Sequence, residues 1–188
     1  GGCTTAIGIP GALAVASGQA AATLAFLTLC ESGDHIVASA SLYGGTYNLL
    51  HYTMPKMGIE VTFLDDPHDL DAWRNAIQDN TKAFFGEVLP NPKNDVFDIE
   101  GVSGVAHDNG LPLIVDNTVP TPYLIRPLEW GADIHRRLAT RPDVHRHHLL
   151  VFGHCAGKGT LMVTGRNGNR GACTDPHSLR YLRPQSAR

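Results

Sequence analysis

The chain has 188 residues, of which 43% are hydrophobic and 18% are charged, as is ordinary for a globular protein. No apolar run reaches the roughly 18 residues that a membrane span needs, and the first residues lack the basic start of a signal peptide. We therefore expect a cytoplasmic protein with no membrane partner. The four cysteines are scattered without paired spacing, which indicates neither a disulfide framework nor a CxxC zinc site.

Strand and helix signals alternate along the first two thirds of the chain. In chain order, the predicted elements are helix 20–30, strand 35–38, a helix ending near 57, strand 60–64, helix 69–77, strand 82–89, helix 98–107 and strand 111–115. Ser17 and Gly33 are the boundaries expected of the first helix. Short links between alternating elements are typical of βαβ units. They predict an α/β fold with a mostly parallel sheet.

The charge changes sign abruptly after Ile134. Residues 1–134 hold 5 basic and 16 acidic side chains, whereas residues 135–188 hold 10 basic and 2 acidic ones, with six of the ten histidines. We interpret 1–134 as part of one domain and 135–188 as an atypical basic tail, in which only 149–152 is strand-like. A basic tail can bind nucleic acid, but this one lacks interleaved aromatic residues for base stacking. We expect no nucleic-acid partner. The abrupt change of charge also fits translation in a shifted reading frame, which is the favoured interpretation of the tail.

Three groups of residues could carry chemistry. Residues 17–19 stand at a helix N-terminus, which suits an anionic phosphate, although Ser17 could simply cap the helix. Tyr43 lies on a glycine-rich loop, where it could stack on a flat ring or pack as an ordinary tyrosine. Asp116 ends a buried strand, near Asn91 of the preceding strand end, and could bind a ligand or make a structural hydrogen bond.

Together these groups suit a flat, anionic cofactor that contains nitrogen. The helix end would hold a phosphate, Tyr43 would lie against the ring, and Asp116 would pair with the ring nitrogen. Pyridoxal 5'-phosphate has this shape, and an aspartate is one of its usual ring-nitrogen partners.

Five ordered motifs give the chain a resemblance to a known family. They are Ala16-Ser-Gly-Gln-Ala20, Ser41-Leu-Tyr-Gly-Gly-Thr-Tyr47, Asn91-Pro92, Ile114-Val-Asp-Asn-Thr118 and Gly131-Ala-Asp-Ile134. The sequence resembles the Cys/Met-metabolism family of pyridoxal-phosphate enzymes from about residue 11 to residue 134. The resemblance implies a fold-type I large domain, here truncated, with a three-layer α/β/α architecture and a homo-oligomeric assembly.

The resemblance also implies an activity and roles for single residues. It implies that O-acetylhomoserine and sulfide give homocysteine and acetate, with a cystathionine synthase or lyase reaction as the alternative. The implied cofactor-binding residues are Ser17, Gly18, Gln19, Tyr43, Asn91, Asp116, Thr118 and Thr140. Tyr43 is also implied to be catalytic, because it orients the ring.

The sequence departs from the family at the residue that should anchor the cofactor. The family has Ser-Ala-Thr-Lys after the Gly131–Ile134 motif, whereas this chain reads Leu138-Ala-Thr-Arg141. A Schiff base needs a neutral amine, and the guanidinium of Arg141 is effectively always protonated. We therefore expect little or no turnover, and a non-catalytic cofactor-binding protein is the alternative.

Three further patterns, two in the tail and one before it, are weaker indications of a binding site. Residues 153–160 resemble a phosphate-binding loop, but their spacing is one residue short. Five donors of a kind that binds zinc, His145, His147, His148, His154 and Cys155, follow no known zinc spacing. The acidic run 65–69 is interpreted as a solvated turn and a helix cap. We expect no metal site in any of these segments.

Overall fold

A single mixed sheet organises the protein. The computed structural model describes residues 11–15, 17–141 and 144–153, and the sheet has the strand order β1-β7-β6-β5-β4-β2-β3. Its strands are β1 (Gly11–Val15), β2 (His35–Ser39), β3 (Glu60–Leu64), β4 (Thr81–Glu87), β5 (Leu113–Asp116), β6 (Ile134–Arg141) and β7 (Val144–Gly153).

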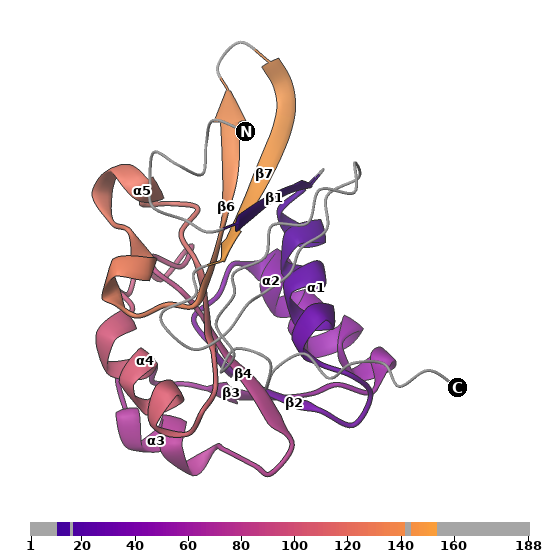
Figure 1. Ribbon diagram of the computed structural model, residues 1–188, viewed down its shortest axis with the longest axis vertical. Coiled ribbons are helices and arrows are strands. Elements are labelled where there is room, and N and C mark those ends of the chain that lie inside the picture. Colours follow the sequence, from indigo (N-terminus) through magenta and orange to yellow (C-terminus); the bar gives the residue numbers. More distant parts are fainter. Residues whose placement is uncertain (1–10, 16, 142–143, 154–188) are drawn as a thin grey trace.

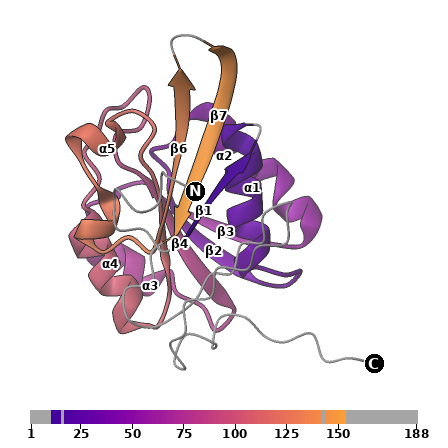
Figure 2. The same ribbon diagram turned by 45° about the horizontal axis from the view of Figure 1, so that its top comes forward.

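The centre of the sheet is parallel and one side is antiparallel. The pairs β2/β3, β2/β4, β4/β5 and β5/β6 are parallel. The long hairpin of β6 and β7 and the pairing of β7 with β1 are antiparallel, and Figure 2 shows this hairpin rising beyond the other strands. The predicted α/β architecture with a mostly parallel sheet is confirmed.

Helices cover both faces of the sheet. The helices are α1 (Gly18–Leu29), α2 (Gly44–Asn48), α3 (Leu70–Asn75), α4 (Ile99–Asp108) and α5 (Thr121–Leu124). A π-helical turn, Leu49–Thr53, and a 3-10 turn, Pro55–Met57, continue α2, and another 3-10 turn covers Pro127–Trp130. Figure 1 shows α1 and α2 on one side of the sheet and α3 and α4 on the other. The three-layer prediction is therefore confirmed.

Alternation along the strands divides the core into two clusters. Ala83, Phe85 and Ile114 belong to the cluster that includes α1, whereas Phe84 and Leu113 belong to the cluster that includes α4. Successive strand residues point to opposite faces. The side chains two positions beyond Phe85 and Ile114 are therefore expected on the α1 face.

Side-chain caps start three helices where the sequence predicts them. Ser17 Oγ accepts a hydrogen bond from the Ala20 N–H over 3.1 Å at the start of α1. Asp69 and Asp98 accept equivalent bonds at the starts of α3 and α4. Each cap satisfies backbone donors that have no partner within the helix.

The expected elements are found with small shifts, and the tail contributes more sheet than expected. Helix α3 ends at Asn75 rather than residue 77. The strand predicted at 149–152 is part of β7, and β6 continues through Arg141. In the described part of the chain, no helix is long and apolar enough to cross a bilayer. Residues 154–160 of the loop-like motif, with His154 and Cys155, lie outside the described residues.

Candidate cofactor site

Three ionisable side chains lie side by side on neighbouring parallel strands, at the ends of β4 and β5 and near the start of β6. Glu87 is the register partner of Asp116 across β4 and β5, and Asp116 is the register partner of Arg136 across β5 and β6. By the alternation described above, all three belong to the face of the sheet that α1 covers. Their residues are 5%, 7% and 3% exposed, in that order. The carboxyl ends of β4 and β5, together with the third residue of β6, thus form a buried cluster of ionisable side chains.

Arg136 is the centre of this cluster. Its Nη2 lies 2.7 Å from Asp116 Oδ2 and donates to Thr46 Oγ1 of α2 over 2.8 Å. Its Nη1 donates to the carbonyl oxygen of Gly18, the first residue of α1, over 3.0 Å. One guanidinium therefore ties β5 to both helices that lie above this edge of the sheet.

Both oxygens of Asp116 have partners. Its Oδ1 accepts from the backbone N–H of Thr118 over 2.9 Å and from Thr118 Oγ1 over 2.5 Å, and its Oδ2 forms an ion pair with Arg136 Nη2 at 2.7 Å. The sequence left open whether this aspartate binds a ligand or makes structural hydrogen bonds. The structure displays structural bonds, and the implied contact with a ring nitrogen stays a prediction.

The Glu87 carboxylate is buried, and its contacts offset only part of the cost of burying its charge. Its Oε2 accepts from the Tyr43 backbone N–H over 2.9 Å, while Oε1 is 3.8 Å from Arg136 Nη2, beyond hydrogen-bonding distance. Burial, followed by the nearby Asp116 carboxylate, raises the pKa of Glu87 to about 7. These effects outweigh the Tyr43 hydrogen bond, the attraction of Arg136 and the Thr46 hydroxyl, which lower the pKa.

The loop before α2 brings Tyr43 to the same place. Tyr43 is 53% exposed. A Cβ on Gly45 would lie only 2.6 Å from the Tyr43 ring and 3.0 Å from the amide nitrogen of Gln19. Gly45 thus allows the Tyr43 ring and the Gln19 side chain to approach the same stretch of backbone. Gly18, Gln19, Tyr43, Asp116 and Thr118 therefore lie around one edge of the sheet, with Ser17 at the start of α1, and their implied roles in cofactor binding stay predictions.

Three other predicted site residues lie farther along their segments. Asn91 is exposed in the turn after β4, directly before a proline with a cis peptide bond. Thr140 and Arg141 end β6, where their backbones pair with His147 and Val144 of β7. Their implied roles stay predictions.

Glu87, Thr46 and Arg136 belong to the cluster but were not among the predicted site residues. Glu87 lies inside the strand predicted at 82–89, and Thr46 lies inside the motif Ser41–Tyr47. A usable signal was present, because Glu87, Asp116 and Arg136 each stand two positions after an apolar residue that faces α1. Arg136 was missed because the arginine-rich segment gave no strand periodicity.

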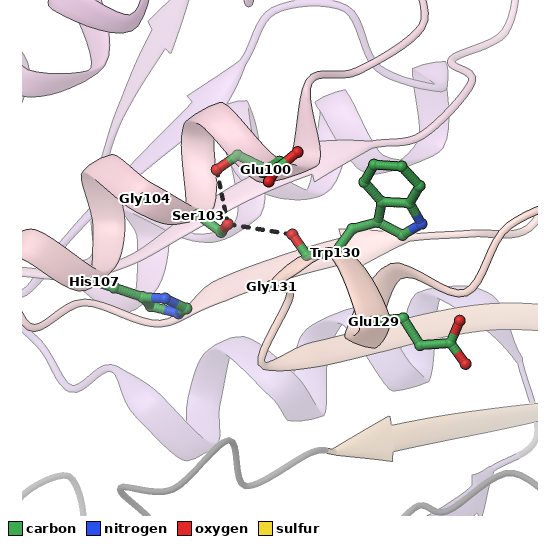
Figure 3. Close-up of a pocket in the computed structure, with 7 residues that line it drawn as sticks. All are labelled: Glu100, Ser103, Gly104, His107, Glu129, Trp130 and Gly131. Carbon is green, nitrogen blue, oxygen red and sulfur yellow. Dashed lines mark hydrogen bonds between the residues drawn. The ribbon is translucent and has the colours of Figure 1, made fainter.

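A separate surface pocket lies beside α4, next to the amino end of β6. Figure 3 shows it between α4 and the turn before β6, with Ser103 at its centre. Ser103 Oγ donates to the carbonyl oxygens of Glu100 and Trp130 over 3.0 and 3.3 Å. The hydroxyl is thus used to join α4 to the turn, and no predicted site residue lines this pocket.

Comparison with known proteins agrees with this geometry. The model of the family described as "Cys/Met metabolism PLP-dependent enzyme" matches residues 6–177. The chain belongs to this family. The O-acetyl-L-homoserine sulfhydrylase of Leptospira meyeri is 50% identical over 160 residues, which are 85% of this chain and 34% of that enzyme. The chain thus spans about a third of the length of this curated relative.

Solved structures extend the likeness to the fold. An O-acetylhomoserine sulfhydrylase of Wolinella succinogenes has a TM-score of 0.76 and 37% identity, covering 80% of this chain and 44% of that one. A putative O-acetylhomoserine (thiol)-lyase of Campylobacter jejuni, which contains N'-pyridoxyl-lysine-5'-monophosphate, has a TM-score of 0.71 and 33% identity over 77% of this chain and 36% of that one. The predicted fold-type I large-domain fold is confirmed.

The residues present here do not fit pyridoxal phosphate as this family uses it. An enzyme of this kind forms a Schiff base with a lysine and pairs the ring nitrogen with a charged side chain. In this chain, arginine stands at the position that the resemblance assigns to that lysine, and the Asp116 carboxylate is ion-paired with the Arg136 guanidinium. The helix N-terminus at residues 17–19 and the Tyr43 ring remain compatible with the phosphate and the ring, but the two decisive contacts are altered.

Proposed function

We propose that this chain derives from an O-acetylhomoserine sulfhydrylase. We also propose that the chain, with its present sequence, does not catalyse the reaction of that enzyme. The parent reaction would replace the acetoxy group of O-acetylhomoserine with sulfide, giving homocysteine and acetate in methionine biosynthesis. The identity to sulfhydrylases supports the ancestry. Arg141 carries the proposal of inactivity, because a delocalised, protonated guanidinium does not attack an aldehyde.

The family acts in cysteine and methionine metabolism on amino-acid substrates. We further propose that the parent enzyme uses O-acetylhomoserine and sulfide as its substrates. A homo-oligomeric assembly and a cytoplasmic location are also part of this proposal. A cystathionine synthase or lyase is the alternative parent, since contacts with the cofactor are shared by these reactions. Gln19 and the run from Ser41 to Thr46 favour the sulfhydrylase.

The reversal of charge after Ile134 supports a second part of the proposal. We propose that residues 1–134 preserve the large-domain sequence and that residues 135–188 were translated in a shifted reading frame. One inserted or deleted base would account for both the arginine-rich segment and the lost lysine. Resequencing the gene around codons 130–145 tests this, and an unshifted frame with the same tail would contradict it.

A trapping experiment tests the proposed inactivity. The purified full chain is incubated with pyridoxal phosphate, reduced with borohydride, and analysed by peptide mass mapping. In parallel, homocysteine formation from O-acetylhomoserine and sulfide is measured. We expect no site-specific adduct and no homocysteine, with an active sulfhydrylase as the positive control. Homocysteine formation, or an adduct on a single lysine, would contradict the proposal.

The same experiment separates the non-catalytic alternative. Reversible binding of the cofactor, detected by the change in its absorbance and lost on dialysis, would favour a binding protein without chemistry. The exposed ring of Tyr43 is the observation that supports this alternative. Lys82 at the start of β4 is a control for nonspecific labelling, because it lies at the far end of that strand, 3.6 Å from Asp34.

A further inference from the structure

The Arg136 guanidinium is enclosed by groups of the protein in the way that a bound ligand would be. Its guanidinium is almost fully buried and contacts groups from three elements: the carboxylate of Asp116, the hydroxyl of Thr46 and the carbonyl of Gly18. A Cβ on Gly18 would lie 3.4 Å from Arg136 Nη1, an ordinary van der Waals contact. A planar cation is therefore closely surrounded at the strand edge where the cofactor ring of the family is expected.

Counting lone pairs indicates why a second cation is disfavoured. A carboxylate oxygen has about two acceptor sites. Asp116 Oδ1 already accepts from Thr118 N and Thr118 Oγ1, and Oδ2 is ion-paired with Arg136. A protonated ring nitrogen would have to share Oδ2 with the guanidinium. Two cations on one buried oxygen repel each other, and the repulsion is screened less there than in water.

The charge of the cluster is also already balanced. The pKa of Glu87 is raised to about 7, so below that pH Glu87 is mostly protonated. The cluster then holds one carboxylate, Asp116, and one guanidinium, Arg136. No net negative charge is left to attract another cation.

We propose that Arg136 is the resident cation of this site, that it takes the place on Asp116 of the ring nitrogen of pyridoxal phosphate, and that removing its side chain opens an anionic pocket for a small planar cation. This inference rests on the proposed function for the identity of the excluded cofactor. It explains the altered ring contact independently of the substitution at position 141.

Chemical rescue tests the pocket directly. The full chain with Arg136→Ala is compared with the unaltered chain in thermal unfolding, with guanidinium chloride at millimolar concentration and with sodium chloride and urea as controls. We expect guanidinium alone to raise the unfolding temperature of the variant, because a ligand that binds only the folded state stabilises it. The unaltered chain should gain nothing, since its pocket is filled.

Matched variants keep this test decisive. Arg136→Met fills the space of the side-chain stem without charge and should respond less than Arg136→Ala. Arg136→Ala combined with Asp116→Asn and Glu87→Gln removes the anionic groups and should not respond. If Arg136→Ala does not fold alone, its refolding yield with and without guanidinium becomes the measurement. Equal effects of guanidinium on all variants, or no effect on Arg136→Ala, would overturn the proposal.

A second measurement separates this inference from the proposed inactivity. Reversible binding of pyridoxal phosphate is followed by absorbance in four chains: unaltered, Arg136→Val, Arg141→Lys, and the double variant. We expect Arg136→Val to bind at least about tenfold tighter than the unaltered chain, and borohydride to label position 141 only in the double variant. Labelling of Arg141→Lys alone to the same extent would overturn the exclusion by Arg136. Labelling of the unaltered chain at a single lysine would instead contradict the proposed function.

Discussion

The backbone N–H of Tyr43 donates a hydrogen bond to Oε2 of Glu87 over 2.9 Å, which joins the loop before α2 to the carboxyl end of β4. The other carboxylate oxygen, Oε1, has no hydrogen-bond partner among the described residues and is 3.8 Å from Arg136. Glu87 therefore positions the tyrosine loop but pays a desolvation cost whenever it is ionised. That cost makes the stability of the fold depend on pH.

We expect Glu87→Gln to flatten the dependence of stability on pH. The pKa of Glu87 is about 7 in the folded chain, against an ordinary value of 4.5. Between these values the folded state binds more protons than the unfolded state, so the free energy of unfolding falls as the pH rises. The loss is on the order of 3 kcal/mol at most. Urea denaturation at a pH below 4.5 and at a pH above 7 measures it.

Glu31→Gln is the matched control, because Glu31 is exposed in the turn after α1. Its pH profile should match that of the unaltered chain. An identical slope for Glu87→Gln and the unaltered chain would contradict the assignment of the titration to Glu87.

Local sequence patterns predicted most of the helices and strands, because the boundaries of these elements are set by neighbouring residues. The cap at Ser17 and the left-handed backbone of Gly33 (φ 94°) are properties of a few neighbouring residues. The position of Asp116 followed from the rule that parallel strands end at a common edge. These regularities were enough to gather Tyr43, Asp116 and residues 17–19 at one place.

The central contact of the site depended on long-range pairing that local patterns do not encode. Strand β6 has the arginine-rich sequence His135-Arg-Arg137 in its first half, and it pairs with β5 on one side and with β7 on the other. The side chain of Arg136 then contacts Gly18, which is 118 positions earlier in the chain. A hydrophobic period read along one segment has no access to a contact of this length, so the guanidinium was not among the predicted site residues.

We expect Asp116→Asn to destabilise the fold strongly. The substitution leaves the buried Arg136 guanidinium without its 2.7 Å carboxylate partner. Breaking a buried ion pair from one side costs about 3–5 kcal/mol. The free energy of unfolding, measured in urea below pH 7, where Glu87 is mostly protonated, gives the loss.

The double variant Asp116→Asn with Arg136→Met provides the comparison. It removes both charges, and replacing a buried pair with neutral groups is often close to neutral. We expect the double variant to be more stable than Asp116→Asn alone. Additive losses from the two substitutions would mean that the ion pair does not couple them.

We expect His107→Gln to change stability mainly at low pH. His107 Nε2 lies 2.9 Å from Asp133 Oδ2, and this hydrogen bond, only partly opposed by burial, raises the pKa of His107 above its ordinary 6.5. The stabilisation is fully present below 6.5 and is lost as the pH rises through the folded value. Because the pair is partly exposed, we expect an effect below about 1 kcal/mol.

Asp133→Asn is the contrasting variant for this pair. Asp133 Oδ2 also accepts from the Leu113 backbone N–H over 2.8 Å at the start of β5. Asp133→Asn should therefore lower stability on both sides of pH 6.5, whereas His107→Gln should not. The two unfolding profiles, measured in urea across this range, show whether Asp133 stabilises the fold mainly through its ion pair with His107 or through its hydrogen bond to the backbone.

We expect Gly86→Ala and Gly104→Ala to change stability in opposite directions. A Cβ on Gly86 in β4 would lie 2.4 Å from the ring of Phe97, which is buried in the cluster that includes α4. Moving that ring should cost about 1–3 kcal/mol. A Cβ on Gly104, exposed within α4, would meet nothing within 4 Å, and alanine there should add about 0.5–1 kcal/mol. Thermal unfolding of both variants tests the pair. A loss at Gly104 equal to that at Gly86 would mean that the close approach of Phe97 to the β4 backbone is not the cause.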